Sequence, residues 1–177
     1  MELIILSGLP GSGKTTYANS LDGVQVVSRD NWRELERQRL NTIEYFPHGS
    51  AAKEYVHWAD YLASVINTGF YKSICIDQTT LTINAAIKLL NAICVRCPDA
   101  WNNDLHVKFV VLTTPIHICM ARNDQRIGKA RVPDETMMGM IRSFNIHAGD
   151  MRRKFDAQPL LRGLKFDIKF IRSPEGE

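Results

Sequence analysis

The stretch "GLPGSGKT", residues 8–15, limits the fold of this chain more than any other feature. It matches the pattern G-x-x-x-x-G-K-[S/T] at every defined position, and it directly follows the apolar run "ELIILS" (2–7). Such a loop works between a buried strand and a helix, because N–H groups of the loop and of the helix N-terminus then converge on one anion. The sequence therefore predicts a strand, a phosphate-binding loop and a helix in this order. A glycine-rich turn without a ligand is the weaker interpretation.

The loop predicts a nucleoside triphosphate ligand and a role for each polar side chain. Lys14 is expected to reach the β- and γ-phosphates, Thr15 to place its hydroxyl on Mg²⁺, and Thr16 to contact the α-phosphate. We therefore expect ATP as the phosphoryl donor and Mg²⁺ as the metal ion. The residues expected to bind them are Gly8, Gly11, Ser12, Gly13, Lys14, Thr15, Thr16 and Arg122, with Thr15 as the metal ligand.

Strand-like and helix-like segments alternate along the chain. This alternation predicts an α/β fold with a mainly parallel sheet, whose functional site lies at the carboxyl ends of the strands. The expected strands are 2–7, 24–27, 72–77, 105–113 and 164–171, and the expected helices are 14–21, 31–40, 51–67, 81–97, one from Pro115 to about Gly128, and one that opens at 133–135.

Composition places the chain among ordinary globular proteins. With 177 residues, 45% of them hydrophobic, we expect one domain over residues 1–177, and the net charge of +3 neither requires nor excludes a nucleic acid partner. Cys94 and Cys97 form a C-x-x-C without a second pair, which favours unpaired thiols in a reducing cytoplasm; a redox pair is the alternative. The run 2–7 is too short for a signal peptide, so we expect a cytoplasmic protein, in the host cytoplasm if the chain is phage-encoded, with no membrane partner.

The phosphoryl acceptor is the next question, and the chain length favours a small kinase. A GTPase usually carries N-K-x-D, which this sequence lacks, and a motor ATPase is normally longer. Asp77, at the end of the strand 72–77, is placed to hold Mg²⁺ through water or to orient an arginine; a plain turn residue is the alternative.

"ARNDQRIGKARVP" (121–133) is a candidate lid within 115–133, in which Arg122 and Arg126 share a helix face and Arg131 follows in a glycine-containing loop together with Lys129. Lid arginines neutralise the charge on a transferred phosphoryl group; a solvated basic helix end is the alternative.

"SRDNWR" (28–33) supplies the candidate base. Asp30 follows the second strand, where it can accept the proton of an attacking hydroxyl, and the alternative is a helix N-cap. Arg29, Arg33 and Arg37 recur every four residues, which predicts a basic row on one helix face. That row is either a solvated surface or a track for a nucleic acid backbone. Trp32 and Tyr45 are candidates to stack on a base of such an acceptor, and for Trp32 a place in the core is the favoured alternative.

Four segments together, "GLPGSGKTT", "SRDNWR", "CIDQTTL" and "RNDQR…VP", resemble the kinase domain of phage polynucleotide 5′-hydroxyl kinases of the T4 type, over roughly residues 2 to 150. The resemblance implies a P-loop kinase-like three-layer fold with a helical, arginine-bearing lid. It implies that Asp30 is the general base, that Arg33 binds a phosphate of the acceptor, and that Asp77 supports Arg33. It also makes Arg126 the catalytic lid arginine. The catalytic set is then Lys14, Asp30 and Arg126, and the acceptor set is Arg33, Asp77 and Arg29.

The same resemblance implies an activity: transfer of the γ-phosphate of ATP to the 5′-hydroxyl end of DNA or RNA, in nucleic acid end repair. The T4-type enzymes also carry a phosphatase domain with a D-x-D-G-T motif that this sequence lacks, so we expect a separate 3′-phosphatase or ligase as a partner. A homo-oligomer is left open. Two rivals remain: a small-molecule kinase acting on a nucleoside, nucleotide or sugar, and an ATP-switched nucleic acid binder without catalysis.

Overall fold

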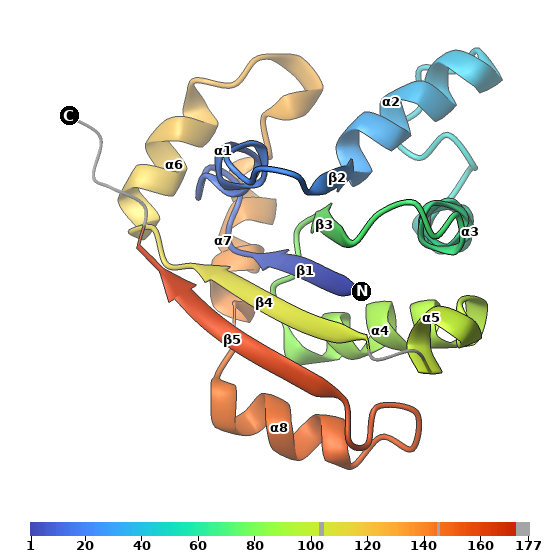
Figure 1. Ribbon diagram of the computed structural model, residues 1–177. Helices are drawn as coiled ribbons and strands as arrows, with labels where there is room; N and C mark the ends of the chain where they lie inside the picture. Colours follow the sequence, from blue (N-terminus) through green and yellow to red (C-terminus); the bar gives the residue numbers. More distant parts are fainter. Residues whose placement is uncertain (103–104, 145, 173–177) are drawn as a thin grey trace.

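A five-stranded parallel sheet forms the centre of the molecule in the computed structural model, which describes residues 1–102, 105–144 and 146–172. The strand order is β2-β3-β1-β4-β5, and every neighbouring pair runs parallel (Figure 1). This confirms the predicted α/β fold with helices around a parallel sheet. The strands are β1 (Glu2–Ser7), β2 (Gln25–Ser28), β3 (Ser73–Asp77), β4 (His106–Leu112) and β5 (Lys165–Ile171).

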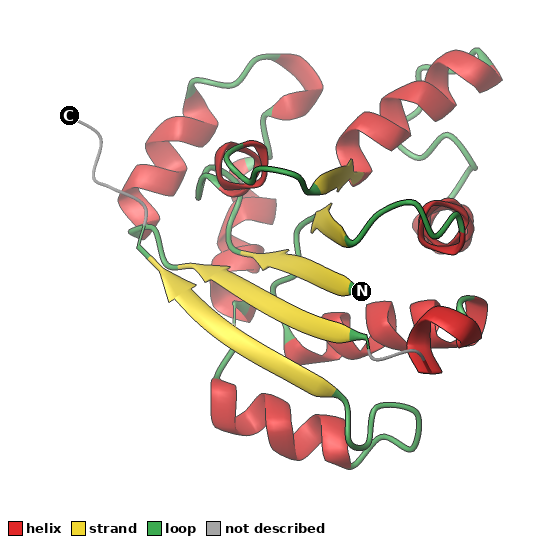
Figure 2. Ribbon diagram, viewed as in Figure 1, coloured by secondary structure: helices red, strands yellow, loops and turns green. Residues whose placement is uncertain are grey.

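Helices follow the strands in the predicted order, as the colouring by secondary structure in Figure 2 shows. The helix Ala51–Asn67 has the predicted limits, whereas the helix predicted to run from Pro115 to about Gly128 ends at Asp124. Two helices were not predicted, Pro98–Asn102 and Ala148–Asp156. The helices are α1 (Lys14–Asn19), α2 (Arg29–Leu40), α3 (Ala51–Asn67), α4 (Ile83–Arg96), α5 (Pro98–Asn102), α6 (Ile116–Asp124), a 3₁₀ turn η1 (Gly128–Ala130), α7 (Asp134–Ser143) and α8 (Ala148–Asp156).

The sheet is buried on both faces, which explains its continuous apolar strands. Successive side chains of β1 point to opposite faces. Leu3 and Ile5 pack into the larger core with residues of α3, α4 and α8, while Ile4 and Leu6 pack with Ala18 of α1. Figure 1 shows these helices on the two sides of the sheet. The result is three layers, as the resemblance implied; one domain over the whole chain stays a prediction.

The start of α2 differs from one prediction. Its N-cap is Ser28, whose hydroxyl accepts a hydrogen bond from the Asn31 N–H at 3.5 Å. Asp30 is therefore the second helical residue and not the cap, so the capping alternative for this acid is wrong. Trp32, two residues further on, is buried as predicted.

The carboxyl ends of three neighbouring strands bring the predicted site residues together. The phosphate-binding loop follows β1, α2 follows β2, and Asp77 ends β3. Ser28 and Asp77 are paired in the β2–β3 register, so the start of α2 lies beside the carboxyl end of β3.

All four cysteines are free thiols, as predicted. Within the described parts of the chain, helices that are both long and apolar enough to cross a bilayer are absent.

Candidate active site

The phosphate-binding loop has the backbone that its glycines permit. Gly8, Gly11 and Gly13 have φ angles of 151°, 79° and 91°, in a region that residues with a side chain rarely adopt. A Cβ on Gly11 would also lie 2.5 Å from the carbonyl oxygen of Cys119 in α6, so the loop and the lid helix touch here. The Ser12 hydroxyl is buried without a hydrogen-bond partner among the described residues, as expected of a group that donates its hydrogen bond to a ligand oxygen.

Lys14 lies inside the loop that it is expected to serve. It is only 9% exposed, and its Nζ donates to the carbonyl oxygens of Gly8 and Leu9, both at 2.8 Å. Burial lowers the pKa of Lys14 from 10.5 to about 8, while the Asp77 carboxylate opposes the shift. A bound triphosphate would add further negative charge beside this ammonium group and would raise its pKa again.

Thr15 and Asp77 form the candidate magnesium site. The Thr15 hydroxyl donates to Asp77 Oδ2 at 2.8 Å, and both residues line the same cavity. A hydroxyl and a carboxylate are the hard oxygen ligands that Mg²⁺ prefers, and Mg²⁺ commonly completes its shell with phosphates and water. The residues therefore fit the predicted ion. They also correct one prediction: Asp77 pairs with Thr15, and it is not the acid that supports Arg33.

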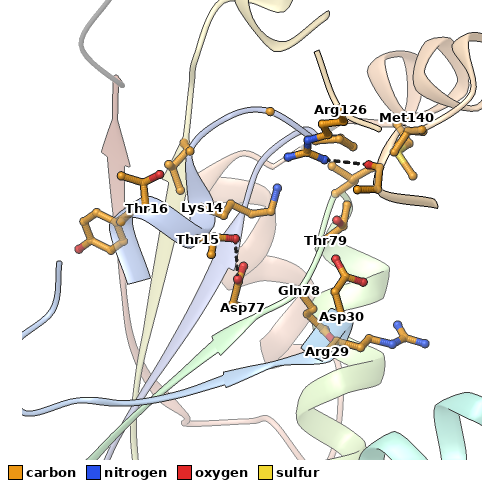
Figure 3. A pocket seen from close by; sticks show the side chains of 18 of the residues that line it. Lys14, Thr15, Thr16, Arg29, Asp30, Asp77, Gln78, Thr79, Arg126 and Met140 are labelled. Carbon is orange, nitrogen blue, oxygen red and sulfur yellow. Dashed lines mark hydrogen bonds between the residues drawn. The ribbon is translucent and has the colours of Figure 1, made fainter. Parts of the chain in front are cut away.

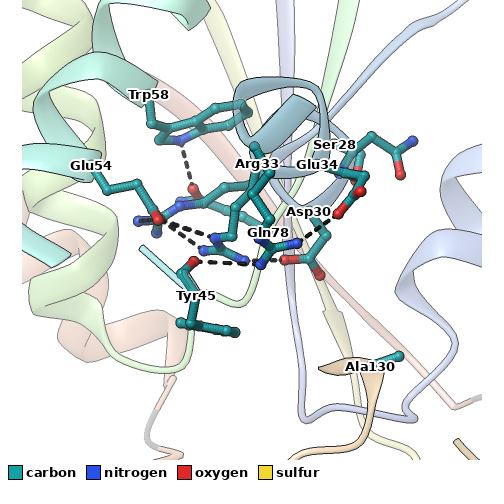
Figure 4. Close-up of polar contacts among 12 residues, drawn as sticks. Ser28, Asp30, Arg33, Glu34, Tyr45, Glu54, Trp58, Gln78 and Ala130 are labelled. Atoms are coloured by element: carbon teal, nitrogen blue, oxygen red, sulfur yellow. Dashed lines mark hydrogen bonds and ion pairs between the residues drawn. The ribbon is translucent and has the colours of Figure 1, made fainter. Parts of the chain in front are cut away.

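The acid that supports Arg33 is Glu54 of α3, which sequence reasoning missed. Arg33 Nη2 lies 2.9 Å from Glu54 Oε1, and its Nε donates to both carboxylate oxygens at 3.2 Å. The remaining nitrogen, Nη1, lies 2.6 Å from Oδ1 of Asp30, so Arg33 joins the buried acid to the candidate base (Figure 4). The Asp30 side chain is 89% exposed and faces the cavity, free to meet an acceptor hydroxyl.

The arginine row of α2 is not a solvated surface. The side chains of Arg29, Arg33 and Arg37 are 22%, 9% and 12% exposed, and each pairs with a carboxylate. Arg29 Nη2 binds Glu54 at 3.1 Å, and Arg37 Nη1 binds Glu34 at 2.7 Å.

The aromatic ring of Tyr45 lies beside this row. The guanidinium carbon of Arg33 is 4.9 Å from the ring centre, a cation–π distance. Arg37 holds the loop that carries the ring, because its Nε donates to the Glu44 carbonyl at 3.0 Å. Tyr45 remains 49% exposed and lines the cavity, so one side of the ring is accessible to a ligand.

The predicted lid contributes two of its arginines to the cavity. Arg122 Nη1 donates to the Gly11 carbonyl at 3.3 Å, which places it over the phosphate-binding loop. Arg126 also lines the cavity, although it lies beyond the end of α6 and does not share a helix face with Arg122 as predicted. Arg131 instead pairs with Asp124 and Asp134 on the outside of the lid, at 3.0 and 2.7 Å. The side chain of Lys129 is outside the described set.

The lid loop is closed by Asn123, a second residue that sequence reasoning missed. Its amide donates to the Val132 carbonyl at 2.8 Å and accepts from the Val132 N–H at 3.0 Å. Only 2% of Asn123 is exposed, so this pair fixes both ends of residues 124–131. The signal in the sequence was a polar residue on the buried side of α6.

These groups surround one cavity of about 1680 Å³. That volume exceeds the several hundred Å³ of a typical small-ligand pocket, so it has room for a nucleotide and a second substrate. Figure 3 shows Lys14, Asp77, Asp30 and Arg126 around it, with Thr16 at its edge. The site residues predicted from the sequence that line it are Gly11, Gly13, Lys14, Thr15, Thr16, Arg29, Asp30, Arg33, Asp77, Arg122 and Arg126.

With this geometry in place, comparison with known proteins gives a clear assignment. Residues 3–146 match the sequence pattern of a family described as "AAA domain". The chain belongs to the AAA domain family. This AAA domain has no significant match among curated proteins.

Solved structures similar to this AAA domain have the fold of P-loop kinases. A protein from Chloroflexus aurantiacus j-10-fl, provisionally named a kinase, matches with a TM-score of 0.61 and 15% identity over 96% of this chain and 84% of its own. A sugar kinase from Janibacter sp. HTCC2649 matches with a TM-score of 0.53 and 15% identity over the same shares. Shikimate kinase from Acinetobacter baumannii, in complex with shikimate, matches with a TM-score of 0.52 and 20% identity over 98% and 84%. At these identities the likeness concerns the fold alone.

Proposed function

We propose that this chain is an ATP-dependent kinase that phosphorylates a hydroxyl group of a small molecule, such as a nucleoside, a nucleotide or a sugar. The observation that carries the proposal is the shared cavity: the phosphate-binding loop, the Thr15–Asp77 pair, the exposed Asp30 carboxylate and Arg126 all face it. A cavity that holds only a nucleotide would not need an acid and an arginine row opposite the loop.

The residues that line the cavity have separate roles in the proposed reaction. Backbone N–H groups of the loop and the Lys14 ammonium bind the phosphates of ATP, and Mg²⁺ held by Thr15 and Asp77 would neutralise charge on them. Asp30 accepts the proton of the acceptor hydroxyl while the oxygen of that hydroxyl bonds to the γ-phosphorus. The bond from that phosphorus to the β-phosphate oxygen breaks, which leaves ADP. Arg122 and Arg126 neutralise the negative charge that spreads over the transferred group.

Two observations support a small acceptor. The three arginines of α2 that line the cavity are balanced by three carboxylates, those of Glu54, Asp30 and Glu34, so they offer no excess positive charge to a polyanion. Solved structures of the same fold include enzymes named for small acceptors, a sugar kinase and shikimate kinase.

A polynucleotide 5′-hydroxyl kinase is the second candidate. It is favoured by the order of the four motifs, from "GLPGSGKTT" to "RNDQR…VP". Arg29, Arg33 and Arg37 line the cavity in a row, and the accessible ring of Tyr45 offers a surface on which a terminal base stacks. In this reading the nucleic acid end enters the cavity and its phosphate displaces one carboxylate partner of Arg33.

Labelled ATP separates the two candidates. The protein is incubated with Mg²⁺, ATP labelled in its γ-phosphate, and either a panel of nucleosides, nucleotides and sugars or an oligonucleotide with a 5′-hydroxyl end. The proposal predicts label on a member of the panel, and the second candidate predicts label on the oligonucleotide. Nucleotide-dependent binding of the oligonucleotide without any transfer would instead identify a non-catalytic switch.

A further inference from the structure

Glu54 is a charged residue in a place where charge is costly. It lies on α3, has no exposed surface, and is four residues before the buried Trp58 on the same helix face. A carboxylate in such a position needs partners for both oxygens. It has them: Oε1 accepts from Arg29 Nη2 and Arg33 Nη2, and Oε2 accepts from Arg33 Nε at 3.2 Å.

Arg33 has little freedom between Glu54 and Asp30. Two of its three nitrogens are bound to Glu54, and the third lies 2.6 Å from Asp30 Oδ1. The ring of Tyr45 faces the guanidinium group, as Figure 4 shows. The orientation of Arg33, and through it the position of the Asp30 carboxylate, is therefore set by an acid on a different helix.

The same contacts balance charge. On the acceptor side of the cavity, Arg29 and Arg33 face Asp30 and Glu54, two positive groups against two negative ones. A phosphorylated acceptor placed against α2 would have to compete with Glu54 for Arg33, whereas an uncharged hydroxyl compound would not.

We propose that Glu54 is a positioning residue that determines the geometry of Asp30 and the preference of the site for acceptors of a given charge. By holding Arg33 against Asp30, it fixes the carboxylate that takes the acceptor's proton. By cancelling the charges of Arg29 and Arg33, it selects an acceptor that carries no phosphate where it meets α2. This inference rests on the proposed kinase function, because it assigns Asp30 to the acceptor.

The central variant is Glu54→Gln, which keeps the shape and one oxygen of the side chain but removes its charge. Asp60→Asn is the matched control, since Asp60 lies on the same helix and pairs with Arg96 at 2.7 Å, but its side chain is 58% exposed and outside the cavity. With thymidine as the acceptor probe, kcat is expected to fall about 10²-fold in Glu54→Gln, because the base is misplaced. The affinity for a non-hydrolysable ATP analogue is expected to stay as in the wild type, and Asp60→Asn to match the wild type throughout.

The charge part of the proposal has its own readout, the preference for thymidine 3′-monophosphate over thymidine measured as a ratio of kcat/KM values. Removal of one negative charge beside Arg33 is expected to raise that ratio about tenfold. A residue that only ties α2 to α3 would lower both activities equally and leave the ratio unchanged, and that result would overturn the proposal.

A double variant tests whether Glu54 acts through Arg33, and it also serves if Glu54→Gln alone fails to fold. Arg33→Gln with Glu54→Gln removes one charge of each sign, so the buried pair is replaced by two neutral amides. Its kcat is expected to equal that of Arg33→Gln alone, because the route from Glu54 to Asp30 is already cut. A further multiplicative loss in the double variant would contradict the proposal.

A readout without turnover separates this inference from the proposed function. If the wild type labels no acceptor at all, the proposed function fails. The hold on Arg33 is still measured by the hydrogen exchange of its Nε–H in NMR spectra. Slow exchange is expected in the wild type and in Asp60→Asn, and fast exchange in Glu54→Gln. Equal exchange in all three would overturn the positioning role.

Discussion

The Thr15 hydroxyl donates a hydrogen bond of 2.8 Å to Asp77 Oδ2, so the first turn of α1 and the end of β3 meet in one oxygen-rich corner of the cavity. If this corner holds Mg²⁺, Asp77→Asn lowers the apparent affinity for Mg²⁺ by about 10–100-fold. The measurement is kinase activity against Mg²⁺ concentration at saturating ATP. Unchanged Mg²⁺ dependence would place the ion elsewhere.

The lowered pKa of Lys14 leads us to expect that nucleotide binding depends on pH. Burial lowers its pKa to about 8 in the free protein, and bound phosphates raise it. Below this pKa the lysine carries its proton before and after binding, so binding affinity is constant. Above it the free protein has lost the proton, and ATP binding takes one up and weakens as pH rises. Calorimetry with a non-hydrolysable analogue, in two buffers of different ionisation enthalpy, measures the uptake. Wild-type protein that binds without proton uptake above this pKa would contradict the account, and Lys14→Met is the control.

Asp30→Asn tests the base. The change keeps the size of the side chain and leaves the phosphate-binding loop untouched, so ATP affinity is expected to stay the same. Turnover is expected to fall by about 10²–10⁴-fold, the usual contribution of a positioned base. A rapid-quench assay of phosphoryl transfer measures the chemical step itself. Full activity of the variant would remove Asp30 from the mechanism.

Arg126→Ala tests the lid. Loss of a charge that faces the transferred phosphoryl group is expected to lower kcat by about 10³-fold or more, with little change in ATP affinity. Arg131→Ala is the matched variant in the same loop, because Arg131 pairs on the outside of the lid with Asp124 and Asp134. Its loss is expected to be much smaller. Equal losses in the two variants would mean that the lid acts as a structural unit only.

Gly11→Ala tests the contact between the loop and the lid helix. The residue has a φ of 79°, and its Cβ would lie 2.5 Å from the Cys119 carbonyl oxygen. Backbone strain of this kind costs about 1–3 kcal/mol. We expect a lower midpoint of thermal unfolding and loss of ATP binding. Gly69→Ala is the control, since Gly69 also has a positive φ but nothing lies within 4 Å of its Cβ position. It is expected to lose stability and keep ATP binding.

The fold was predictable because its signals are local. The apolar run of β1 and the loop after it define a strand and a helix within a few residues, and parallel pairing follows from the alternation of elements. Helix α8 was missed because it is polar: among its described side chains only Met151 and Phe155, four residues apart, are buried. Helix α5 was missed because Pro98, read as the end of the preceding helix, is its first residue.

The loop, Asp30 and the lid arginines could be named as candidate site residues because each belongs to a short motif. Glu54 was missed because its partners lie 21 and 25 residues away, and no local spacing reports such a contact. The available signal was an acid on the apolar face of α3, four residues before Trp58. For Asp77 the residues left Mg²⁺ and an arginine open, and the resemblance favoured the arginine. The contact with Thr15 depends on how β3 pairs beside β1, which sequence spacing does not determine.

The most direct test of the central claim follows the fate of the γ-phosphate. The protein is incubated with Mg²⁺ and ATP labelled in that group, together with the acceptor panel, and the products are separated into phosphate esters and inorganic phosphate. The account predicts label in an ester of the acceptor, and its disappearance from that ester in Asp30→Asn. Label that appears as inorganic phosphate alone, at the same rate with and without every acceptor, would contradict it.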